Sequence, residues 1–419
     1  MYDAIGGVSF HLSKMWSPVT KEVIPRLHLS SALCVALEAN VVEILRGHPQ
    51  GLHVRDIAAQ NEMEPVKLGR VLRLLATHHI FNEMVPDTFR NNRISSMMET
   101  LKSVDEINTS PENKHVRATG VSASLEHGAD EVFKSSAYLA EVLLDKQLDL
   151  IKYQYVFKTE KNMFDWYEEP ENEYRLKRCC AAMEGAAKLN PPNAILAGKY
   201  ATDSNGGLGS LANGSVVVDV GGGMGHTTLK EHKEHSSLKS WFKIDLRLSS
   251  KRSSSGAQTI PTQHAVSSGS VILQAQDFFA PQQVRTPAVS MCRMFFHDYG
   301  NSVAEKILKQ LRSAASSNIK LLIIDQIVPY ACLNETTQSL TSGIVVSKAP
   351  ASFPPLPPPV LANLGKANSI TIIGDLQMYT SQGDEERTLG SFIDLGSWKI
   401  EEVFTIPGSI HKQILAVPV

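Results

Sequence analysis

The chain has 419 residues, 42% of them hydrophobic, and its formal net charge is −2 at pH 7. This length predicts two domains or more, and the composition suits large hydrophobic cores rather than a disordered chain. The near-neutral charge gives no electrostatic reason to expect nucleic acid or a membrane as a partner, and no stretch of the sequence approaches the length and apolarity of a membrane span.

The N-terminal segment and the cysteines predict a cytoplasmic protein. The chain starts with MYDAIGGVSFHLSKMW, which lacks the basic region followed by an apolar stretch that marks a signal peptide. The five cysteines are an odd number, and none of their spacings suits a zinc site or a disulfide framework. We therefore expect reduced thiols and no metal cluster.

The first third of the chain predicts a winged-helix module. Residues 28–46 and 65–81 carry apolar side chains at helical spacing, and a short helix can form between them. Strand-like pieces follow in 82–95, around a Pro-Asp turn. Such modules often read DNA with a basic helix, here the one that holds Lys67, Arg70 and Arg73. The absence of net positive charge favours a dimerisation or packing module instead.

The later residues predict a mainly helical segment and then a parallel sheet. Residues 130–188 look helical, and the Gly/Asn/Ser-rich residues 203–215 form a boundary loop. After the loop, strand and helix signals alternate, as they do in a parallel sheet with crossover helices. The strands are expected at 216–220, 241–246, 291–296 and 320–327, and an antiparallel pair at 398–406 and 412–419. The Ser-rich stretch 246–270 and the Pro-rich stretch 348–361 fit this alternation poorly.

A glycine-rich loop follows the first strand of the predicted sheet, in VVVDVGGGMGHTTL. Gly221 and Gly223 match the first two glycines of a dinucleotide fingerprint, but the third position is His226. The lysine of a phosphate-binding loop is also missing. Asp219, just before the glycines, would repel a polyphosphate but attract the ammonium group of a ligand.

Two more carboxylates follow strand candidates. Asp245 ends the next one, where an acid accepts hydrogen bonds from a ribose diol. Asp277 ends or follows a third, and Phe278 after it could flank an adenine ring whose amino group binds the acid. An amine, a ribose and an adenine without a required phosphate describe S-adenosylmethionine, the cofactor that the three acids predict.

His297 and Asp298 lie between a strand and a helix, where ligands meet an open α/β sheet. Asp325 ends another strand candidate, and Glu386 lies in a loop before a helix candidate. An imidazole suits a general base near neutral pH, and a nearby carboxylate would orient it. Methyl transfer from a sulfonium to an oxygen needs alignment, removal of a proton and exclusion of water, so a metal-free mechanism fits.

From about residue 24 onward the chain resembles the class I S-adenosylmethionine-dependent O-methyltransferases of the caffeic-acid type, which are common in plants and fungi. The resemblance rests on several stretches: VVVDVGGGMG, DFFAPQ, RMFFHDYGN, LLIIDQIVP, NLGKANS, DLQM, EERT and ILAVPV. It implies a helical, winged-helix-like dimerisation domain over 1–150 and a Rossmann-like catalytic domain over 151–419, with a helical connector over 151–200. It also implies a homodimer.

The resemblance further implies roles for particular residues. His297 is the base, and Asp325 and Glu386 are its flanking acids. The cofactor is lined by Asp219, Gly221, Gly223, Asp245, Asp277 and Phe278. Met183 and Met378 match residues that clamp an aromatic acceptor, and Asp298 is a further candidate for contact with it. The predicted reaction is metal-free methylation of a hydroxyl on a small phenolic or secondary-metabolite substrate.

Two departures from the family pattern keep other hypotheses open. The Ser-rich stretch replaces a helix and a strand, and the segment between Glu386 and Trp398 is shortened. One alternative is a related enzyme that binds the cofactor but catalyses a rearrangement or cyclisation without methyl transfer. The other is a non-catalytic partner in a dimer, which the shortened segment favours. His297, Asp298 and both flanking acids favour the methyltransferase.

Overall fold

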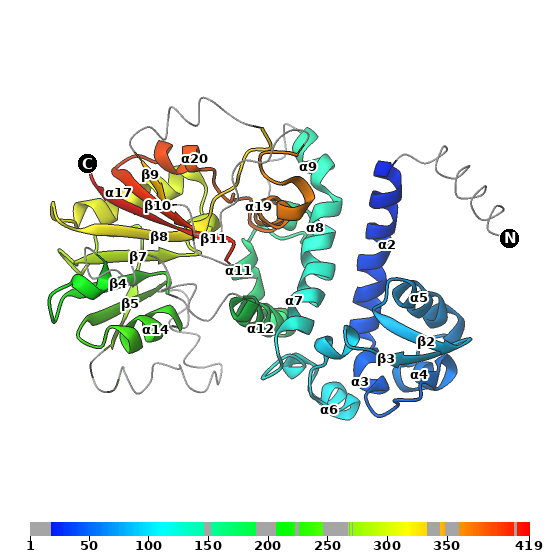
Figure 1. Ribbon diagram of the computed structural model, residues 1–419. Helices are drawn as coiled ribbons and strands as arrows, with labels where there is room; N and C mark the ends of the chain where they lie inside the picture. The colour runs from blue at the N-terminus through cyan, green and yellow to red at the C-terminus, as the bar shows by residue number, and fades with distance from the viewer. Residues whose placement is uncertain are drawn as a thin grey trace. The chain divides into compact units, whose positions relative to one another are not determined.

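The computed structural model describes residues 18–145, 152–189, 207–222, 226–245, 267, 269, 271–332, 344–347, 360–405 and 409–419. The chain divides into two compact units, Met1–Leu189 (unit 1) and Asn190–Val419 (unit 2). Figure 1 labels their helices and strands. Among the described helices, none combines the length and the apolar character that crossing a membrane requires.

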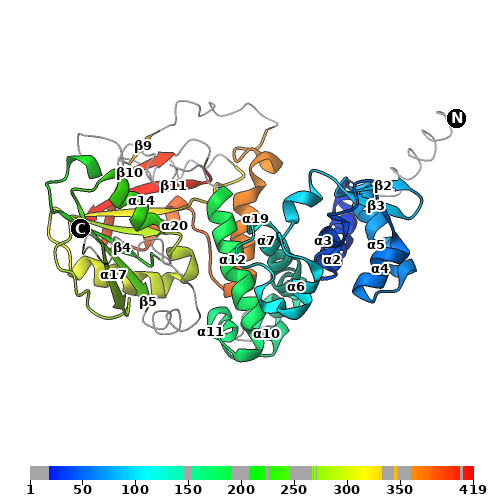
Figure 2. The ribbon, with the colours of Figure 1, turned by 90° about the horizontal axis from the view of Figure 1, so that it is seen from below.

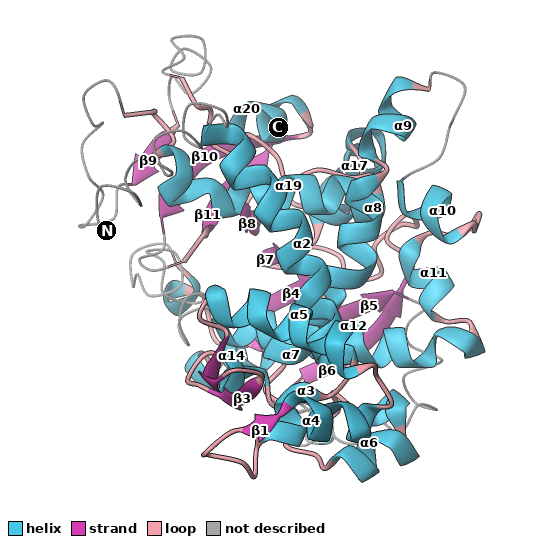
Figure 3. Ribbon diagram, turned by 90° about the vertical axis from the view of Figure 1, so that its right-hand side faces the viewer, coloured by secondary structure: helices cyan, strands magenta, loops and turns pink. Residues whose placement is uncertain are grey.

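Unit 1 begins with the winged-helix arrangement that the sequence predicts. Its helices are α2 (Pro18–Glu38), α3 (Val41–Leu45), α4 (Val54–Asn61) and α5 (Pro65–Thr77), and its strands are β1 (Leu52–His53), β2 (Phe81–Val85) and β3 (Thr88–Asn91). The strands pair antiparallel in the order β1-β3-β2, and β1 and β3 lie beside α3 and α4 (Figure 3). The helix α5 buries Leu68, Leu72 and Leu75 along one face, which is the spacing of an amphipathic helix.

The rest of the described part of unit 1 is helical, as predicted for 130–188. The α-helices are α6 (Val104–Thr109), α7 (Val121–His127), α8 (Phe133–Ala137), α9 (Leu139–Leu144), α10 (Lys152–Phe157), α11 (Met163–Tyr167) and α12 (Glu173–Leu189). A π-helical turn, Gly128–Val132, joins α7 to α8. The helices α7 and α12 pack side by side (Figure 2), and a Cβ added to Gly120 would lie only 2.5 Å from Cα of Gly185. Two glycines therefore permit the close approach of these helices.

Buried charges join α12 to α7 and to the π-helical turn. Arg178 on α12 is 1% exposed and donates hydrogen bonds to Asp130 and Glu131, each at 2.6 Å. Glu126 on α7 is fully buried, and its carboxylate accepts a hydrogen bond from Nζ of Lys114 at 2.7 Å. Removing one partner from such a network would leave a buried charge without compensation, which is strongly destabilising.

Unit 2 is built on an eight-stranded, mainly parallel sheet, which confirms the predicted α/β class. The strands are β4 (Val216–Val220), β5 (Lys239–Asp245), β6 (Val271–Gln276), β7 (Val289–Arg293), β8 (Lys320–Gln326), β9 (Val345–Ser347), β10 (Trp398–Thr405) and β11 (His411–Pro418). Their order is β6-β5-β4-β7-β8-β11-β10-β9. The five strands from β6 to β8 are parallel to one another, and β11 pairs antiparallel with both β8 and β10.

Both faces of this sheet are buried, so its central strands are apolar almost throughout. Val218, Cys292 and Ile323 belong to one core cluster, which also holds residues of the amphipathic helix α17 (Asn301–Ser313). Val217 and Met291 belong to a second cluster. This alternation follows the two-residue period of a strand. The remaining described α-helices of unit 2 are α14 (His226–Glu234), α19 (Ser369–Gln382) and α20 (Leu389–Asp394).

The strand order reverses between β4 and β7. From β4 the chain adds β5 and β6 on one side, then crosses to add β7 and β8 on the other. Ligands of open α/β sheets bind beyond the carboxyl ends of the strands at such a reversal. The strand predicted at 291–296 is shifted, because β7 covers Val289–Arg293 and Met294 adopts a left-handed backbone conformation with φ 45°. This early end lets the chain turn toward His297.

Candidate active site

Asp219 is the buried acid of the first strand of the sheet. It is the next-to-last residue of β4 and is 2% exposed. One carboxylate oxygen, Oδ2, accepts a hydrogen bond from Oγ1 of Thr228 at 2.7 Å, while Oδ1 has no hydrogen-bond partner among the described residues. Burial raises the pKa of Asp219 to about 6, against the opposing effects of Thr228 and Arg293. One buried acceptor oxygen thus stands available to a donor group of a ligand.

The turn after β4 requires a glycine at its first position. Gly221 has φ 74°, and a Cβ at this position would lie 2.2 Å from the ring of Phe295. A larger residue would therefore suffer both backbone strain and a clash. Gly223, the other glycine assigned to the cofactor, lies outside the described residues.

The other two acids predicted to bind the cofactor also lie at the carboxyl ends of strands. Asp245 is the last residue of β5, and Asp277 directly follows β6. Parallel pairing of β4, β5 and β6 brings these strand ends to one edge of the sheet. Asp277 is exposed, and its Oδ1 accepts a hydrogen bond from the backbone N–H of Phe279 at 2.9 Å.

The aromatic residues after Asp277 face different environments. Phe278 is 3% exposed and packs edge-on against Phe295, with ring centroids 5.1 Å apart. Phe279, which the sequence analysis did not single out, is 43% exposed. The pattern of two adjacent aromatics did not show which of them turns toward the core. The assignment of Phe278 to the adenine ring remains a prediction.

His297 lies in a short 3₁₀ turn, Phe296–Asp298, that follows β7 and precedes α17. The histidine is 9% exposed, and three carboxylates surround its ring. Its Nδ1 lies 2.9 Å from Oε1 of Glu386 and 3.9 Å from Oδ1 of Asp325, and its Nε2 lies 3.7 Å from Oδ1 of Asp298. The structure thus brings together the residues that the sequence analysis placed at the centre of the chemistry.

The electrostatics of this cluster favour a protonated histidine. Burial alone would lower the pKa of His297, but the charge of Asp298, the hydrogen bond with Glu386 and the charge of Asp325 outweigh burial and raise the pKa to about 10. Burial also raises the pKa of Asp325 to about 7. Neither carboxylate oxygen of Asp325 has a hydrogen-bond partner among the described residues, so this acid acts on the ring through its charge.

Glu386 reaches His297 although the segment after it is short. It lies in the loop between α19 and α20, and α20 has only six residues. Its backbone N–H donates a hydrogen bond to Oδ1 of Asp375 on α19 at 3.0 Å, and its Oε1 accepts one from Nε2 of Gln326 at 3.1 Å. Two anchors from different elements therefore hold the carboxylate in place.

The two methionines assigned to the acceptor belong to different units. Met183 lies on α12 in unit 1 and is 49% exposed, whereas Met378 lies on α19 in unit 2 and is half-buried. Their joint role as a clamp on an aromatic acceptor remains a prediction.

Two arginines next to the predicted site residues were missed by the sequence analysis. Arg293 ends β7. Burial lowers the pKa of its guanidinium, while the charges of Asp219 and Asp325 oppose this effect. Arg387 directly follows Glu386 and is 1% exposed. Arg293 could have been noticed as a charged residue at the end of an apolar strand. The contacts of Arg387 join distant parts of the chain, so no local pattern reveals them.

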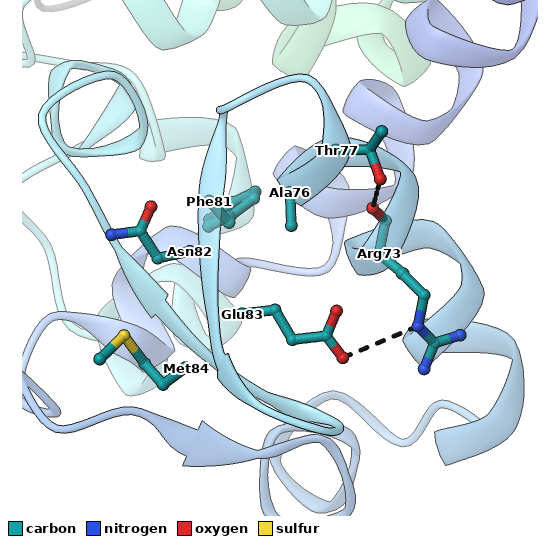
Figure 4. A pocket seen from close by; sticks show the side chains of 7 residues that line it. All are labelled: Arg73, Ala76, Thr77, Phe81, Asn82, Glu83 and Met84. Carbon is teal, nitrogen blue, oxygen red and sulfur yellow. Dashed lines mark hydrogen bonds and ion pairs between the residues drawn. The ribbon is translucent and has the colours of Figure 1, made fainter. Parts of the chain in front are cut away.

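A surface hollow of about 490 Å³ is present in unit 1, between the end of α5 and β2 (Figure 4). Arg73 and Glu83 form an ion pair at its edge, with Nε 3.7 Å from Oε1. None of the predicted site residues lines this hollow, so it is distinct from the cluster around His297.

Comparisons with known proteins place these features in a family context. Residues 22–100 match the model of the O-methyltransferase dimerisation domain. The chain is 34% identical to an O-methyltransferase of Armillaria gallica over 405 residues, which cover 93% of this chain and 82% of that protein. It is 31% identical to 4-O-methyltransferase 1 of Phanerochaete chrysosporium over 401 residues, with the same coverage.

Solved structures share the fold at lower identity. The crystal structure of OxaC in complex with SAH and oxaline matches with a TM-score of 0.68 and 15% identity, and the match covers 100% of this chain and 92% of that one. At this identity the likeness concerns the fold alone.

Proposed function

Because the chain belongs to the S-adenosylmethionine-dependent O-methyltransferases of fungal type, we propose that it methylates a hydroxyl of a small phenolic or other secondary-metabolite substrate with His297 as the general base. The observation that carries this proposal is the 2.9 Å hydrogen bond between Nδ1 of His297 and Glu386, beyond the carboxyl ends of the central strands. A buried imidazole held by a carboxylate is the arrangement that a general base requires.

The residues at the edge of the sheet fit S-adenosylmethionine. Asp219 retains a buried carboxylate oxygen without a hydrogen-bond partner among the described residues, which suits the cofactor's ammonium group. Asp245 and Asp277, at the neighbouring strand ends, are the acids expected to bind its ribose and adenine. When bound, the cofactor supplies a methyl carbon already activated by the positive charge on sulfur. We assign Gly221, Gly223 and Phe278 to the same site.

His297 performs the proton transfer in this proposal. Because its pKa is raised to about 10, His297 must first lose the proton on Nε2; Nδ1 then keeps the proton that it donates to Glu386, and Nε2 accepts the proton of the acceptor hydroxyl. Asp325 and Glu386 then stabilise the imidazolium by their charge. Because the acceptor loses its proton to an imidazole, we expect no metal ion to take part, although the ligand atoms of these three side chains lie within 4.8 Å of one another. Removal of metal by a chelator tests this expectation.

Three residues are proposed to contact the acceptor. Asp298, beside Nε2 of His297, is placed to contact the acceptor hydroxyl. Met183 and Met378 are each proposed to contact an aromatic acceptor, since the flexible thioether side chain adapts to flat apolar ligands.

We further propose that the chain works as a homodimer in the cytoplasm. The matched dimerisation domain, residues 22–100, exposes apolar side chains that a partner could cover: Val66 is 63%, Met84 41% and Val85 59% exposed. Residues 1–150 would serve dimerisation and 151–419 catalysis, although the described helices of the expected connector, α10 to α12, pack within unit 1. No disulfide joins the five cysteines, all of which lie within the described residues, and this fits a reducing compartment.

The geometry around Glu386 favours methyl transfer over a non-catalytic partner subunit. The non-catalytic alternative was suggested by the shortened segment after Glu386. The shortening does not displace Glu386, because its carboxylate lies within hydrogen-bond distance of His297. A base with two flanking acids also favours methyl transfer over a rearrangement or cyclisation, because methylation of a hydroxyl requires removal of its proton.

The test is the substitution His297→Ala, with His78→Ala as the matched control because His78 is an exposed histidine of unit 1. We expect His297→Ala to abolish the appearance of label from methyl-labelled S-adenosylmethionine in phenolic acceptors, while calorimetry still detects cofactor binding. Full turnover by His297→Ala would refute the assignment of the base. A wild-type protein that binds the cofactor but labels no acceptor would favour the cyclisation alternative.

A further inference from the structure

We propose that Arg387 is a positioning residue that holds the backbone on both sides of His297 and thereby keeps the imidazole against Glu386. This inference rests on the proposed function, because it assigns Arg387 a part in the same site. It concerns an arginine whose side chain donates hydrogen bonds to the backbone on either side of the histidine and to Asn301.

The guanidinium of Arg387 makes three hydrogen bonds around the 3₁₀ turn. NH1 donates to the carbonyl oxygen of Phe296 and NH2 to that of Tyr299, each at 2.6 Å. Nε donates to Oδ1 of Asn301 at 2.9 Å, at the first residue of α17. The two carbonyl groups flank His297 in sequence, so a single planar group fixes the backbone before and after the histidine.

The backbone of Arg387 is fixed as well. Its carbonyl oxygen accepts a hydrogen bond from the N–H of Val328, just beyond β8, at 2.9 Å. The preceding residue, Glu386, is tied to Asp375 by its own N–H. The carboxylate that binds His297 and the guanidinium that holds the histidine backbone are therefore neighbours on one immobilised segment.

This arrangement sets the distance between base and acid. The turn has only three residues, and within it the carbonyl oxygen of Phe296 accepts one hydrogen bond, from the N–H of Tyr299 at 3.2 Å. Arg387 satisfies two carbonyls of this region while it is itself 1% exposed. Without the guanidinium, both carbonyls would lose a charged hydrogen-bond donor, and the turn could rotate relative to Glu386. A displacement of about 1 Å at a catalytic group can reduce a rate about 100-fold.

A lysine cannot replace this geometry fully. Its ammonium group is a point donor, whereas the guanidinium presents a rigid fork to two acceptors at once. Arg387→Lys should therefore retain one carbonyl contact and the positive charge but lose the second carbonyl contact. Arg387→Met should lose all three hydrogen bonds while it fills most of the same volume.

The experiment compares Arg387→Lys and Arg387→Met with the control Arg312→Met. Arg312 also donates two side-chain hydrogen bonds to one main-chain oxygen in unit 2, that of Val419, at 3.1 and 2.7 Å, but it lies at the opposite end of α17 from Asn301. Each full-length variant is tested for its melting temperature, its dissociation constant for S-adenosylhomocysteine, kcat and KM, and the pH dependence of kcat. Ring-labelled histidine NMR follows the titration of His297, assigned by the signal that His297→Ala lacks.

We expect Arg387→Met to lose about 100-fold in kcat with cofactor affinity unchanged, and Arg387→Lys to recover part of that loss. The acids that face His297 are Asp298 from its own turn, Asp325 from β8 and Glu386 from the loop, and the charge of His297 also acts on His411 of β11. Loss of the Glu386 contact should move the histidine titration to lower pH in Arg387→Met but not in Arg312→Met.

Two results would overturn the proposal: a folded Arg387→Met variant with wild-type kcat, or an unmoved histidine titration in both Arg387 variants. If Arg387→Met does not fold, the test uses Arg387→Lys. A folded Arg387→Lys variant with the wild-type kcat and the wild-type histidine titration would also contradict the proposal, because lysine cannot bind both carbonyl oxygens as the guanidinium does. If the wild-type protein transfers no methyl group, the proposed function fails, but the histidine titration still decides the role of Arg387.

Discussion

The substitution Glu386→Gln removes the charge beside His297 while it preserves the shape of the side chain. Nδ1 of His297 lies 2.9 Å from Oε1 of Glu386. At this distance and an effective dielectric constant of about 20, the attraction between an imidazolium and a carboxylate is about 6 kcal/mol. Without it, the pKa of His297 should fall from about 10 toward its ordinary value.

The substitution also disturbs the tautomer of the histidine. A glutamine amide can donate a hydrogen bond to Nδ1, which leaves the ring proton on Nε2, the nitrogen that must act as the base. We expect kcat to fall by about 10²–10⁴-fold, the usual contribution of a positioned general base. In the wild type, activity should rise with pH as His297 loses its proton, and in Glu386→Gln the remaining activity should rise at lower pH.

The assay measures initial rates with labelled cofactor from below neutrality to above the pKa of His297, and circular dichroism confirms folding. The matched control is Glu401→Gln, since Glu401 is a partly exposed acid of the same unit that pairs with Lys320 at 3.1 Å. An unchanged kcat together with an unchanged pH profile in Glu386→Gln would refute the reasoning, because the carboxylate would then affect neither the pKa nor the orientation of His297.

Three further predictions concern stability and metal. Glu126→Gln should destabilise unit 1 by about 3–5 kcal/mol in urea unfolding, and an unchanged midpoint would contradict a buried network. Burial alone would raise the pKa of Glu126, but His115 and Lys114 hold this pKa well below its usual range. The ionised Glu126 should therefore stabilise the folded state above about pH 4.5, and this contribution should be lost as the pH falls. In Glu126→Gln, the dependence of stability on acid pH should become smaller. Gly221→Ala should lower the melting temperature and weaken cofactor binding, because the new Cβ would clash with the ring of Phe295. A wild-type melting temperature together with wild-type cofactor affinity would contradict this clash. Dialysis against a chelator should leave methyl transfer intact, and a loss that added divalent ions restore would show that the cluster around His297 works with a metal.

The sheet and its acids could be predicted because their signals are local. Strands alternate or run apolar, and Asp219, Asp245 and Asp277 each stand at or directly after a strand end in the sequence as they do in the structure. Parallel pairing then brings those ends to one edge without further information. The hairpin of β10 and β11 was predicted for the same reason, since two strand signals with a short connection pair antiparallel.

Other features depend on tertiary contacts that a single sequence does not encode locally. His297 and Glu386 are 89 residues apart, so their hydrogen bond was suggested by a family resemblance rather than by spacing. The contacts of Arg387 with Phe296 and Tyr299 span a similar separation and had no such guide. The end of β7 was misplaced because the residues after Arg293 remain apolar while the backbone has already turned.

The position of β11 has a consequence for synthesis of the protein. This strand comes after every other described strand in the sequence, yet it lies between β8 and β10 in the sheet. While a ribosome makes the residues between Gln326 and His411, which takes roughly 4–17 s at ordinary translation rates, the edge of β8 has no neighbour on that side. An unpaired apolar edge readily joins other chains, so nascent unit 2 is exposed to aggregation during this interval. Added chaperones that cover exposed strand edges should therefore raise the yield of folded protein.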